Sequence, residues 1–375
     1  NYPLLKGQQT NLYKCFLPQA WMFNANSGVS AFIHPEGVYD DPNGGALREK
    51  LYQRLRYHFQ YQNELMLFSE VAHRATFSLN VYGSPQSVRF DSISNIFGGN
   101  CIDECYSQDG CTTLEGIKDA NGNWNTKGHP DRIVHLTKKE LAVFAKLFDG
   151  GDNWKQARLP ILHVKEFVDA LETFSRAEKT IESSFEEIKA FTTVCWDETS
   201  SQKDGTICRD VHFPESNVDR IVSGPHIGVA NPLFKTSRKV CKLKSDFDVI
   251  DLSTIPDDYM PRVNYRPAIV LEKFFEREPS LPNGLKYHRA YRILTRRMLN
   301  QSGERTLIPA IYPPNVTHIN TVFGMTFEGL QLLALMAGLE SSILYDFYVK
   351  STGKSDGRYD TLSKFPILQE RNREI

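Results

Sequence analysis

The sequence has no long apolar run and few marks of a secreted protein. No stretch approaches the ~18 consecutive apolar residues that a membrane-spanning helix needs. No signal peptide opens the chain. The 7 cysteines are odd in number and widely scattered, which does not suit a disulfide framework. We therefore expect no membrane partner, and free thiols in a reducing cytoplasm.

An excess of charge of one sign is also lacking, since 44 basic and 45 acidic residues give a formal net charge of −1. The total charge gives no support for a polyanionic partner, so nucleic-acid binding requires a local concentration of basic residues. The length of 375 residues allows two or three domains. A content of 41 % hydrophobic and 24 % charged residues is ordinary for a soluble globular protein.

The first part of the chain has the pattern of an α/β sheet layer. Apolar spacing predicts helices over residues 11–25 and 46–59. Short apolar or alternating runs predict strands over 29–33, 64–68 and 75–82. The order helix, strand, helix, strand, strand is typical of the end of such a layer.

The rest of the chain is less regular, and it shows no internal repeat. Residues 95–130 are rich in Gly, Asn and Asp and predict an irregular insertion. Helices are expected near 137–148 and 163–191, the second of which would bridge to the next domain. From Val194 to Ile375 the short segments with many Pro and Gly breaks indicate a mixed α+β domain.

Three stretches in the first part together carry a resemblance to a known family. In chain order they are Thr10-Asn11-Leu12-Tyr13-Lys14-Cys15-Phe16; Ser27-Gly28-Val29-Ser30-Ala31-Phe32-Ile33-His34-Pro35, followed by Ala46-Leu47-Arg48; and Leu67-Phe68-Ser69-Glu70, followed by the strand 75–81. In this order and spacing they resemble the second half of the catalytic domain of TaqI-like adenine-N6 DNA methyltransferases. The resemblance covers about residues 6–83.

The resemblance implies roles for two aromatic residues. Enzymes of this family flip an adenine out of the duplex and stack it in a pocket. Phe68 matches the aromatic that packs against the flipped base, and Phe16 matches the one that lines the adenine end of the S-adenosylmethionine site. Because stacking suits any base, Phe68 would hold the base without selecting it. The alternative is that both are core aromatics on amphipathic elements.

Two motifs that the resemblance requires are lacking. The family needs a Gly-rich turn for the methyl donor and an Asn-Pro-Pro-Tyr/Phe motif that bonds the target amino group, and both precede the stretch at residues 10–16. Asn231-Pro232-Leu233-Phe234 is only superficially similar, because Leu233 replaces the second Pro and the segment lies far beyond Phe68. We find no catalytic residue and interpret the chain, which opens like the middle of a protein, as a fragment that is inactive alone.

A second resemblance, over about residues 220–370, is to the target-recognition domain of the same enzymes and of related restriction-modification methylases. The segments that carry it are Ser223-Gly224-Pro225-His226-Ile227 with Asn231-Pro232-Leu233; Glu304-Arg305-Thr306-Leu307-Ile308-Pro309-Ala310; Leu333 to Tyr348; and Phe365-Pro366-Ile367. It implies double-stranded DNA as a partner.

A local basic cluster lies within this region. It consists of Lys286, Arg289, Arg292, Arg296, Arg297 and Arg305, against the single acid Glu304. Such a cluster suits phosphate contact, and arginine also reads guanine in the major groove. The alternative is a solvated, ion-paired helix face. The stretch with Lys350, Lys354 and Arg358 is either a DNA-touching loop or a plain surface loop.

A metal site is a weaker hypothesis. Cys101, Cys105 and Cys111, with His129, could hold zinc, but their spacing is not that of CxxC pairs. We therefore predict no metal.

These observations combine into one prediction of architecture and function. Residues 1–95 form the trailing half of a Rossmann-like methyltransferase sheet, 96–200 an irregular insertion and helical bridge, and 201–375 an α+β target-recognition domain. The parent protein would be a site-specific adenine-N6 DNA methyltransferase of restriction-modification or phage-defence type that uses S-adenosylmethionine. Its catalytic half would come from a missing N-terminal segment or a partner subunit. The alternatives are a non-catalytic DNA-specificity subunit and, as a third possibility, a degraded methyltransferase that acts only in assembly.

Overall fold

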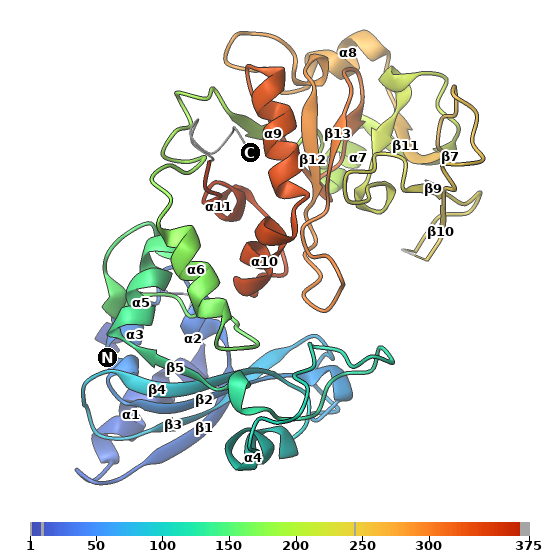
Figure 1. The fold of residues 1–375 in the computed structure, drawn as a ribbon. Coiled ribbons are helices and arrows are strands. Elements are labelled where there is room, and N and C mark those ends of the chain that lie inside the picture. The colour runs from blue at the N-terminus through green and yellow to red at the C-terminus, as the bar shows by residue number, and fades with distance from the viewer. Residues whose placement is uncertain (1, 9–10, 244, 368–375) are drawn as a thin grey trace. The chain divides into compact units, whose positions relative to one another are not determined.

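The computed structural model describes residues 2–8, 11–243 and 245–367, so Thr10 of the first quoted stretch lies outside it. The chain divides into two compact units, Asn1–Glu178 and Lys179–Ile375 (Figure 1). The division falls inside the segment 96–200 that the sequence predicts as a bridge. Both units contain helices and strands, so the fold is mixed α/β.

The first unit is built on a five-stranded sheet with the order β1-β3-β2-β4-β5. Its strands are β1 (Ser30–Pro35), β2 (Leu55–Gln62), β3 (Thr76–Tyr82), β4 (Arg89–Ile96) and β5 (Val134–Thr137). Strand β3 runs antiparallel to both β1 and β2, and β2 is parallel to β4. The carboxyl ends of β1, β2 and β4 therefore meet at one end of the sheet, and β1 is an edge strand.

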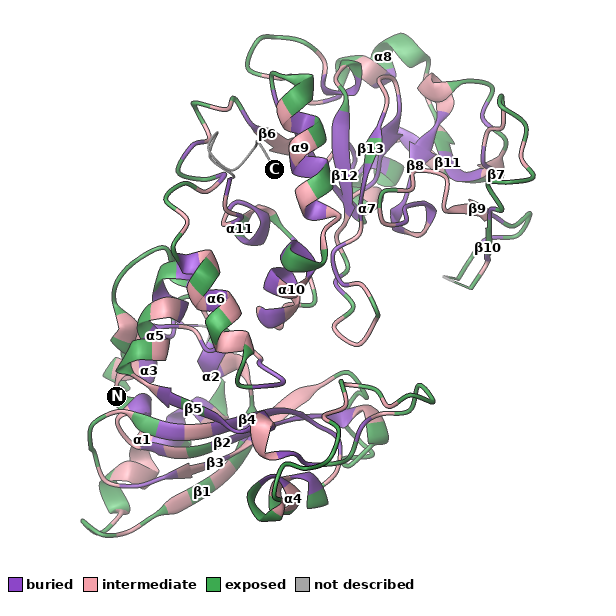
Figure 2. Ribbon diagram, in the orientation of Figure 1, coloured by how far each residue is buried: buried purple, intermediate pink, exposed green. Residues whose placement is uncertain are grey.

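Short helices accompany this sheet. They are α1 (Leu12–Phe23), α2 (Gly37–Asp40), α3 (Gly45–Tyr52), α4 (Asn100–Ser107), α5 (Lys138–Phe144) and α6 (Phe167–Ser175). Helix α5 begins with a capping box, in which Thr137 and Glu140 satisfy each other's backbone N–H groups, and continues as a π turn over Ala145–Asp149. In Figure 2 the central strands are largely buried, whereas β1 is mostly intermediate or exposed.

Several predicted elements are confirmed and others are wrong. Helix α1, strand β1, strand β3 and helix α5 lie where the sequence predicts them. The helix predicted over 46–59 ends at Tyr52, and no strand forms over 64–68. Strand β2 takes the residues between, because from Leu55 onward apolar and polar side chains alternate with the period of two that a strand requires.

The helix predicted over 163–191 is also wrong beyond Ser175, where α6 ends. The chain that follows bonds to a distant segment instead of continuing the helix. The N–H of Ile181 donates to the carbonyl of Phe365 at 3.0 Å, and that of Glu182 to the carbonyl of Ser363 at 2.8 Å. Tertiary pairing has overridden the helical spacing of the apolar residues.

The second unit has many short elements, as predicted for a mixed α+β domain. A four-stranded sheet has the order β13-β12-β15-β6, and three two-stranded sheets pair β9 with β10, β7 with β11, and β8 with β14. The strands are β6 (Phe191–Thr193), β7 (Ile207–His212), β8 (Ile221–Val222), β9 (Lys235–Ser237), β10 (Phe247–Val249), β11 (Val263–Pro267), β12 (Arg292–Arg296), β13 (Pro309–Tyr312), β14 (Thr317–His318) and β15 (Val322–Thr326). The helices are α7 (Glu198–Lys203), α8 (Leu271–Glu276), α9 (Leu330–Glu340), α10 (Ile343–Ser351) and α11 (Tyr359–Leu362).

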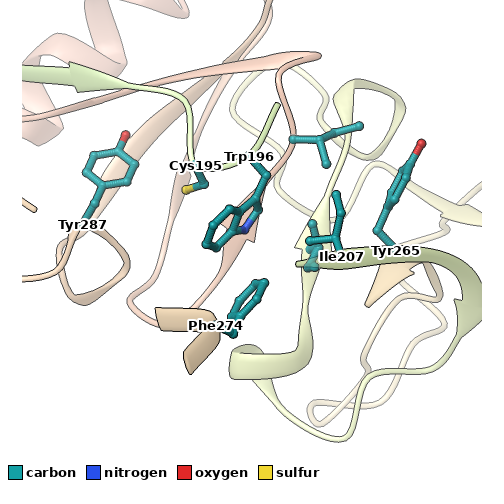
Figure 3. Packing of buried hydrophobic residues seen from close by; sticks show 8 residues of the cluster. Cys195, Trp196, Ile207, Tyr265, Phe274 and Tyr287 are labelled. Atoms are coloured by element: carbon teal, nitrogen blue, oxygen red, sulfur yellow. The ribbon is translucent and has the colours of Figure 1, made fainter. Parts of the chain in front are cut away.

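An aromatic cluster forms one core of this unit (Figure 3). Trp196 and Phe274 lie with ring centroids 4.5 Å apart, beside Tyr265 and Ile207. Because each such ring buries a large apolar area, the cluster contributes strongly to the stability of this unit. No single helix in the described part of the chain is both long and apolar enough to cross a membrane, and only the pair α9 and α10, bent by 64°, has that length and composition together.

Candidate functional site

The loop between β2 and β3 carries Phe68, and a single buried side chain fixes it. Asn63 is fully buried. Its Oδ1 accepts from the N–H of Phe68 at 2.9 Å, while its Nδ2 donates to the carbonyls of Phe68 at 2.9 Å and Val71 at 2.8 Å. Three bonds from one amide hold the loop in a defined conformation.

This fixed loop exposes apolar side chains to solvent. We call Leu65, Met66, Leu67, Phe68 and Val71 the apolar loop; all five are exposed, Phe68 by 42 %. Met66 has a φ of 53°, a left-handed conformation that is uncommon outside glycine. Exposed apolar side chains that neighbour one another in a fixed loop, held in part by a strained residue, are a mark of a binding site.

The apolar loop lies at the carboxyl ends of parallel strands. Phe68 meets Phe77 nearly at right angles, with ring centroids 5.0 Å apart. Phe77 in turn stacks on Tyr61 at the end of β2, at 5.3 Å, and lies opposite Pro35 at the end of β1. Ligands of open α/β sheets bind outside these carboxyl ends.

Further exposed apolar side chains lie on α1 and on or next to β1. We call these residues the apolar edge; they are Leu12, Phe16, Met22, Phe23, Val29 and Ile33. Phe16, the aromatic that the sequence assigns to the methyl donor, is one of them and is 51 % exposed. Since β1 is also the outer strand of its sheet, one side of its backbone is left without a strand partner.

A trio of Glu36, His58 and Ser92 has the composition of a hydrolase triad. Glu36 lies 3.2 Å from Nε2 of His58, and Ser92 Oγ lies 2.9 Å from Nδ1. Burial raises the pKa of Glu36, but the charge of His58 and hydrogen bonds from His58 and Ser78 outweigh it and hold that pKa below its usual value. With Ser92 only 4 % exposed, no substrate reaches the hydroxyl, so the trio stabilises the sheet.

The same face of the sheet ties α1 and α2 to the strands. His34 Nε2 lies 2.9 Å from the hydroxyl of Tyr82, and the hydroxyl of Tyr39 donates to Asn80. Tyr13 of α1 stacks on His34, with centroids 5.4 Å apart. Burial lowers the pKa of His34, so that its ring stays neutral inside the network.

Arg292, one of the six basic residues predicted to contact DNA, is completely buried. Its guanidinium donates to the carbonyls of Ala290 at 3.1 Å, Pro313 at 3.2 Å and Val316 at 2.5 Å. The guanidinium also lies 5.0 Å from the ring centroid of Tyr287. We therefore leave Arg292 out of any DNA-contacting set.

Three further members of the predicted cluster are engaged within the protein. Arg297 forms a two-pronged ion pair with Asp356, at 2.7 and 2.9 Å, which raises the pKa of the guanidinium. Arg305 donates to the carbonyl of Ser341 at 2.7 Å, and Lys286 Nζ donates to the carbonyl of Glu278 at 3.0 Å. Each of these cations is bonded to groups within the protein.

The remaining two members differ in their surroundings. Arg296 is half-buried, within 5.5 Å of the ring of Phe234, and burial lowers the pKa of its guanidinium. Arg289 is exposed and makes one long contact to Asn315, at 3.3 Å. Of the six, Arg289 is thus the residue best placed to meet a ligand.

The stretch with Lys350, Lys354 and Arg358 is likewise engaged. Lys350 Nζ donates to the carbonyl of Gly303 at 3.0 Å, and Lys354 and Arg358 pair with nearby aspartates. This favours the interpretation as a structured surface segment.

Two features that the sequence interpretation missed bear on function. One is Asn63, for which no sequence signal exists, because its role depends on side-chain bonds to backbone groups. The other is the hairpin of β9 and β10, residues 235–249, whose five basic residues against two acidic ones are visible in the sequence. We call residues 235–249 the basic hairpin.

The cysteines considered for zinc do not form a cluster. Cys101 and Cys105 are buried on α4, one turn apart, and Cys111 is exposed in the following loop. Arg132 donates to Cys101 Sγ at 3.0 Å, and the ring of His129 bonds backbone groups of Thr112 and Asp131. Within residues 2–8, 11–243 and 245–367 no three His, Cys, Asp or Glu side chains are grouped so as to hold a metal ion.

Comparison with known proteins finds a distant structural likeness. No family model and no curated protein matches the chain. Among solved structures it is similar to the one titled "Characterization and crystal structure of the type IIG restriction endonuclease BpuSI", with 11 % sequence identity and a TM-score of 0.32. The match covers 99 % of this chain and 43 % of that one, so the chain spans less than half of its length.

Proposed function

We propose that this chain is the trailing part of an adenine-N6 DNA methyltransferase of restriction-modification or phage-defence type. The first unit would supply a wall of the pocket for the flipped adenine, and the second unit would bind double-stranded DNA. The observation that carries the proposal is the apolar loop, which Asn63 holds so that Phe68 is exposed at the carboxyl ends of β1 and β2.

A fixed, exposed aromatic ring at this place suits the capture of an unpaired base. Stacking of a base on an aromatic side chain contributes about 1–3 kcal/mol, and extrusion of a base from a duplex costs a few kcal/mol. A ring that is already ordered loses little conformational entropy when the base arrives. Phe68 therefore offsets a large part of the cost of base flipping.

The apolar edge supports the second element of the proposal, a separate catalytic half. A sheet whose outer strand β1 has no strand on its outer side, and whose flanking helix exposes Leu12, Met22 and Phe23, has an interface left to fill. We assign this surface to the half with the Gly-rich turn and the Asn-Pro-Pro-Tyr/Phe motif. That half would be a preceding segment of a longer protein or a partner subunit.

The methyl donor does not fit this chain alone. Phe16 offers one exposed ring, which suits one face of an adenine. The sequence lacks the Gly-rich turn that would hold the rest of S-adenosylmethionine. We assign donor binding to the parent enzyme and expect no methyl transfer to DNA by this chain alone, which a labelled donor would test directly.

The proposed role of Phe68 is tested with two DNA duplexes that differ in one base. One is fully paired, and the other places an abasic site opposite an adenine, which removes most of the cost of flipping. Fluorescence anisotropy should show that the wild type prefers the abasic duplex. Phe68→Ala should reduce this preference by about 5- to 150-fold, equivalent to the lost stacking energy, while Phe68→Tyr should keep it. Equal preference in Phe68→Ala and wild type would contradict the proposal.

The second candidate is a non-catalytic DNA-specificity subunit, which the apolar edge favours equally because a separate enzyme subunit could cover it. The two candidate functions differ in what covers the apolar edge. A reading frame that continues upstream of Asn1 with the catalytic motif would favour the methyltransferase part. A start codon at that point, with a co-purifying methyltransferase, would favour the subunit.

A further inference from the structure

The basic hairpin concentrates positive charge that the chain as a whole lacks. Between residues 235 and 249 it has four lysines and one arginine against two aspartates, in a protein with a net charge of −1. Figure 1 shows its strands β9 and β10 at the periphery of the second unit, beside β7 and β11. A local concentration of this kind is the electrostatic mark of a polyanion site.

The strands of the hairpin are anchored in the core. Ser237 Oγ lies 3.2 Å from Nε2 of the buried His226, whose ring meets that of Phe247 at 5.2 Å. The N–H of Ser237 donates to the carbonyl of Arg262, and the Arg262 guanidinium returns a bond to the carbonyl of Ser237, both at 3.0 Å. The hairpin is therefore held firmly at the Ser237–Phe247 end of its two strands.

Both acidic residues of the hairpin are engaged within it. Asp246 Oδ2 accepts from the N–H groups of Lys242 at 2.8 Å and Leu243 at 2.7 Å, and these backbone bonds lower the pKa of its carboxyl. Asp248 pairs with Arg238 at 2.8 Å. Lys239 and Lys242 are exposed and have no acidic partner among the described residues. Their ammonium groups are free to meet a ligand.

Further cations lie at the foot of the hairpin. Lys235 Nζ and the guanidinium of Arg296 lie 5.1 and 5.5 Å from the ring of Phe234, and Arg262 lies 4.5 Å from the ring of the exposed Phe213. Cation–π contacts hold these side chains in place without neutralising them. Positive charge therefore continues from the tip of the hairpin to its base.

Exposed aliphatic side chains alternate with the free lysines. Val240 and Leu243, on either side of Lys242, are each 68 % exposed. Groups of this kind contact thymine methyl groups and sugars when a protein segment enters a DNA groove. A two-stranded β-ribbon also fits the major groove, which is about 12 Å wide.

From these observations we infer that the basic hairpin is the element of the second unit that contacts DNA, with Lys239 and Lys242 on the phosphates. This inference rests on the proposed function, because the ligand is the duplex on which the pocket wall would act. It moves the main DNA contact away from residues 286–305, whose cations are largely bound within the fold.

The test compares the full chain with the double variant Lys239→Gln/Lys242→Gln. Binding to a labelled duplex of about 30 base pairs is followed by anisotropy from about 50 to 300 mM salt, because each phosphate contact adds about 0.9 to the slope of log K against log salt. The variant should lose about 1.8 from that slope and bind at least tenfold more weakly at about 100 mM salt. Thermal unfolding should be unchanged, since both side chains are exposed.

The matched control is Lys203→Gln/Lys273→Gln, which removes the same charge from exposed positions on α7 and α8. It should keep the wild-type slope. If the wild type binds DNA and the hairpin variant has the same slope, the inference is overturned while the proposed function stands. If the wild type binds no duplex, whether or not it binds vesicles with anionic lipid, the inference and the proposed function are both overturned.

Discussion

Replacement of Asn63 by alanine tests whether the apolar loop is fixed by one side chain. The amide of Asn63 makes three hydrogen bonds to backbone groups of Phe68 and Val71. At a net value of about 1 kcal/mol for each bond, Asn63→Ala should lower the free energy of local opening of the loop by about 3 kcal/mol. Since 1.36 kcal/mol corresponds to tenfold, amide hydrogen exchange in a peptide spanning the loop should accelerate about 100-fold.

The control for this experiment is Asn80→Ala. Asn80 lies on β3 of the same sheet and is equally buried, but its side chain bonds to Ser78 and to Tyr39 of α2 instead of to the loop. Asn80→Ala should lower the stability of the first unit as a whole without a selective increase of amide hydrogen exchange in the apolar loop. The reasoning is refuted if the loop exchanges at the wild-type rate in Asn63→Ala, or no faster than in Asn80→Ala.

Three further predictions concern the second unit. Burial raises the pKa of Glu340 to about 7, so the protonated carboxyl favours the folded state at acidic pH, and this stabilisation is lost as pH rises through that pKa. Glu340→Gln should therefore stabilise the unit by up to about 3 kcal/mol near pH 8 and change little near pH 4. Hydrogen exchange of β12 measures this difference. Burial lowers the pKa of His226 to about 4 and of His318 to about 3, so the free energy of unfolding from denaturant titration should fall by about 1.4 kcal/mol per pH unit for each as pH drops from about 6.5 to 4; a flat profile would contradict this. A Cβ at Gly324 would lie 2.0 Å from the hydroxyl of Tyr287, so Gly324→Ala should cost at least about 1–3 kcal/mol, and adding Tyr287→Phe should recover most of it in a double-mutant cycle.

The sequence predicted β1 and β3 of the first sheet, but it missed β4 and β5, and it missed β2 because two periodicities overlap there. Leu47, Leu51 and Leu55 share one helical stripe, yet Leu55 also begins the alternation of β2. A window of residues cannot show which period prevails, because the choice depends on the pairing of β2 with β3 and β4. The wrong strand at 64–68 follows from that error, and it placed Phe68 on a strand instead of a loop.

The apolar loop illustrates a second limit. Apolar residues such as Leu67 and Phe68 predict burial, whereas the structure exposes them, because Asn63 bonds to the loop's backbone and leaves the side chains outside. Only the resemblance to a family singled out Phe68. Composition and spacing alone favour a core aromatic at this position.

The basic residues show why charge in a sequence is a poor guide to a charged surface in this fold. Sheets of two to four short strands leave many carbonyl groups without a strand partner, and these must be bonded when they are buried. Arginine suits that task, since it offers five donors and is weakly hydrated. Arg220 donates to the carbonyl of Pro232 at 3.0 Å, and Arg292 serves three carbonyls.

Lysine, a compact and strongly hydrated cation, is the less suitable residue for such burial. The segment 286–305 has five arginines to one lysine, and most of its cations are bound inside the fold. The basic hairpin has four lysines to one arginine, and Lys239 and Lys242 remain exposed. The arginine-rich segment of this domain therefore bonds mainly within the fold, whereas the lysine-rich segment keeps cations at the surface, where the proposed DNA contact requires them.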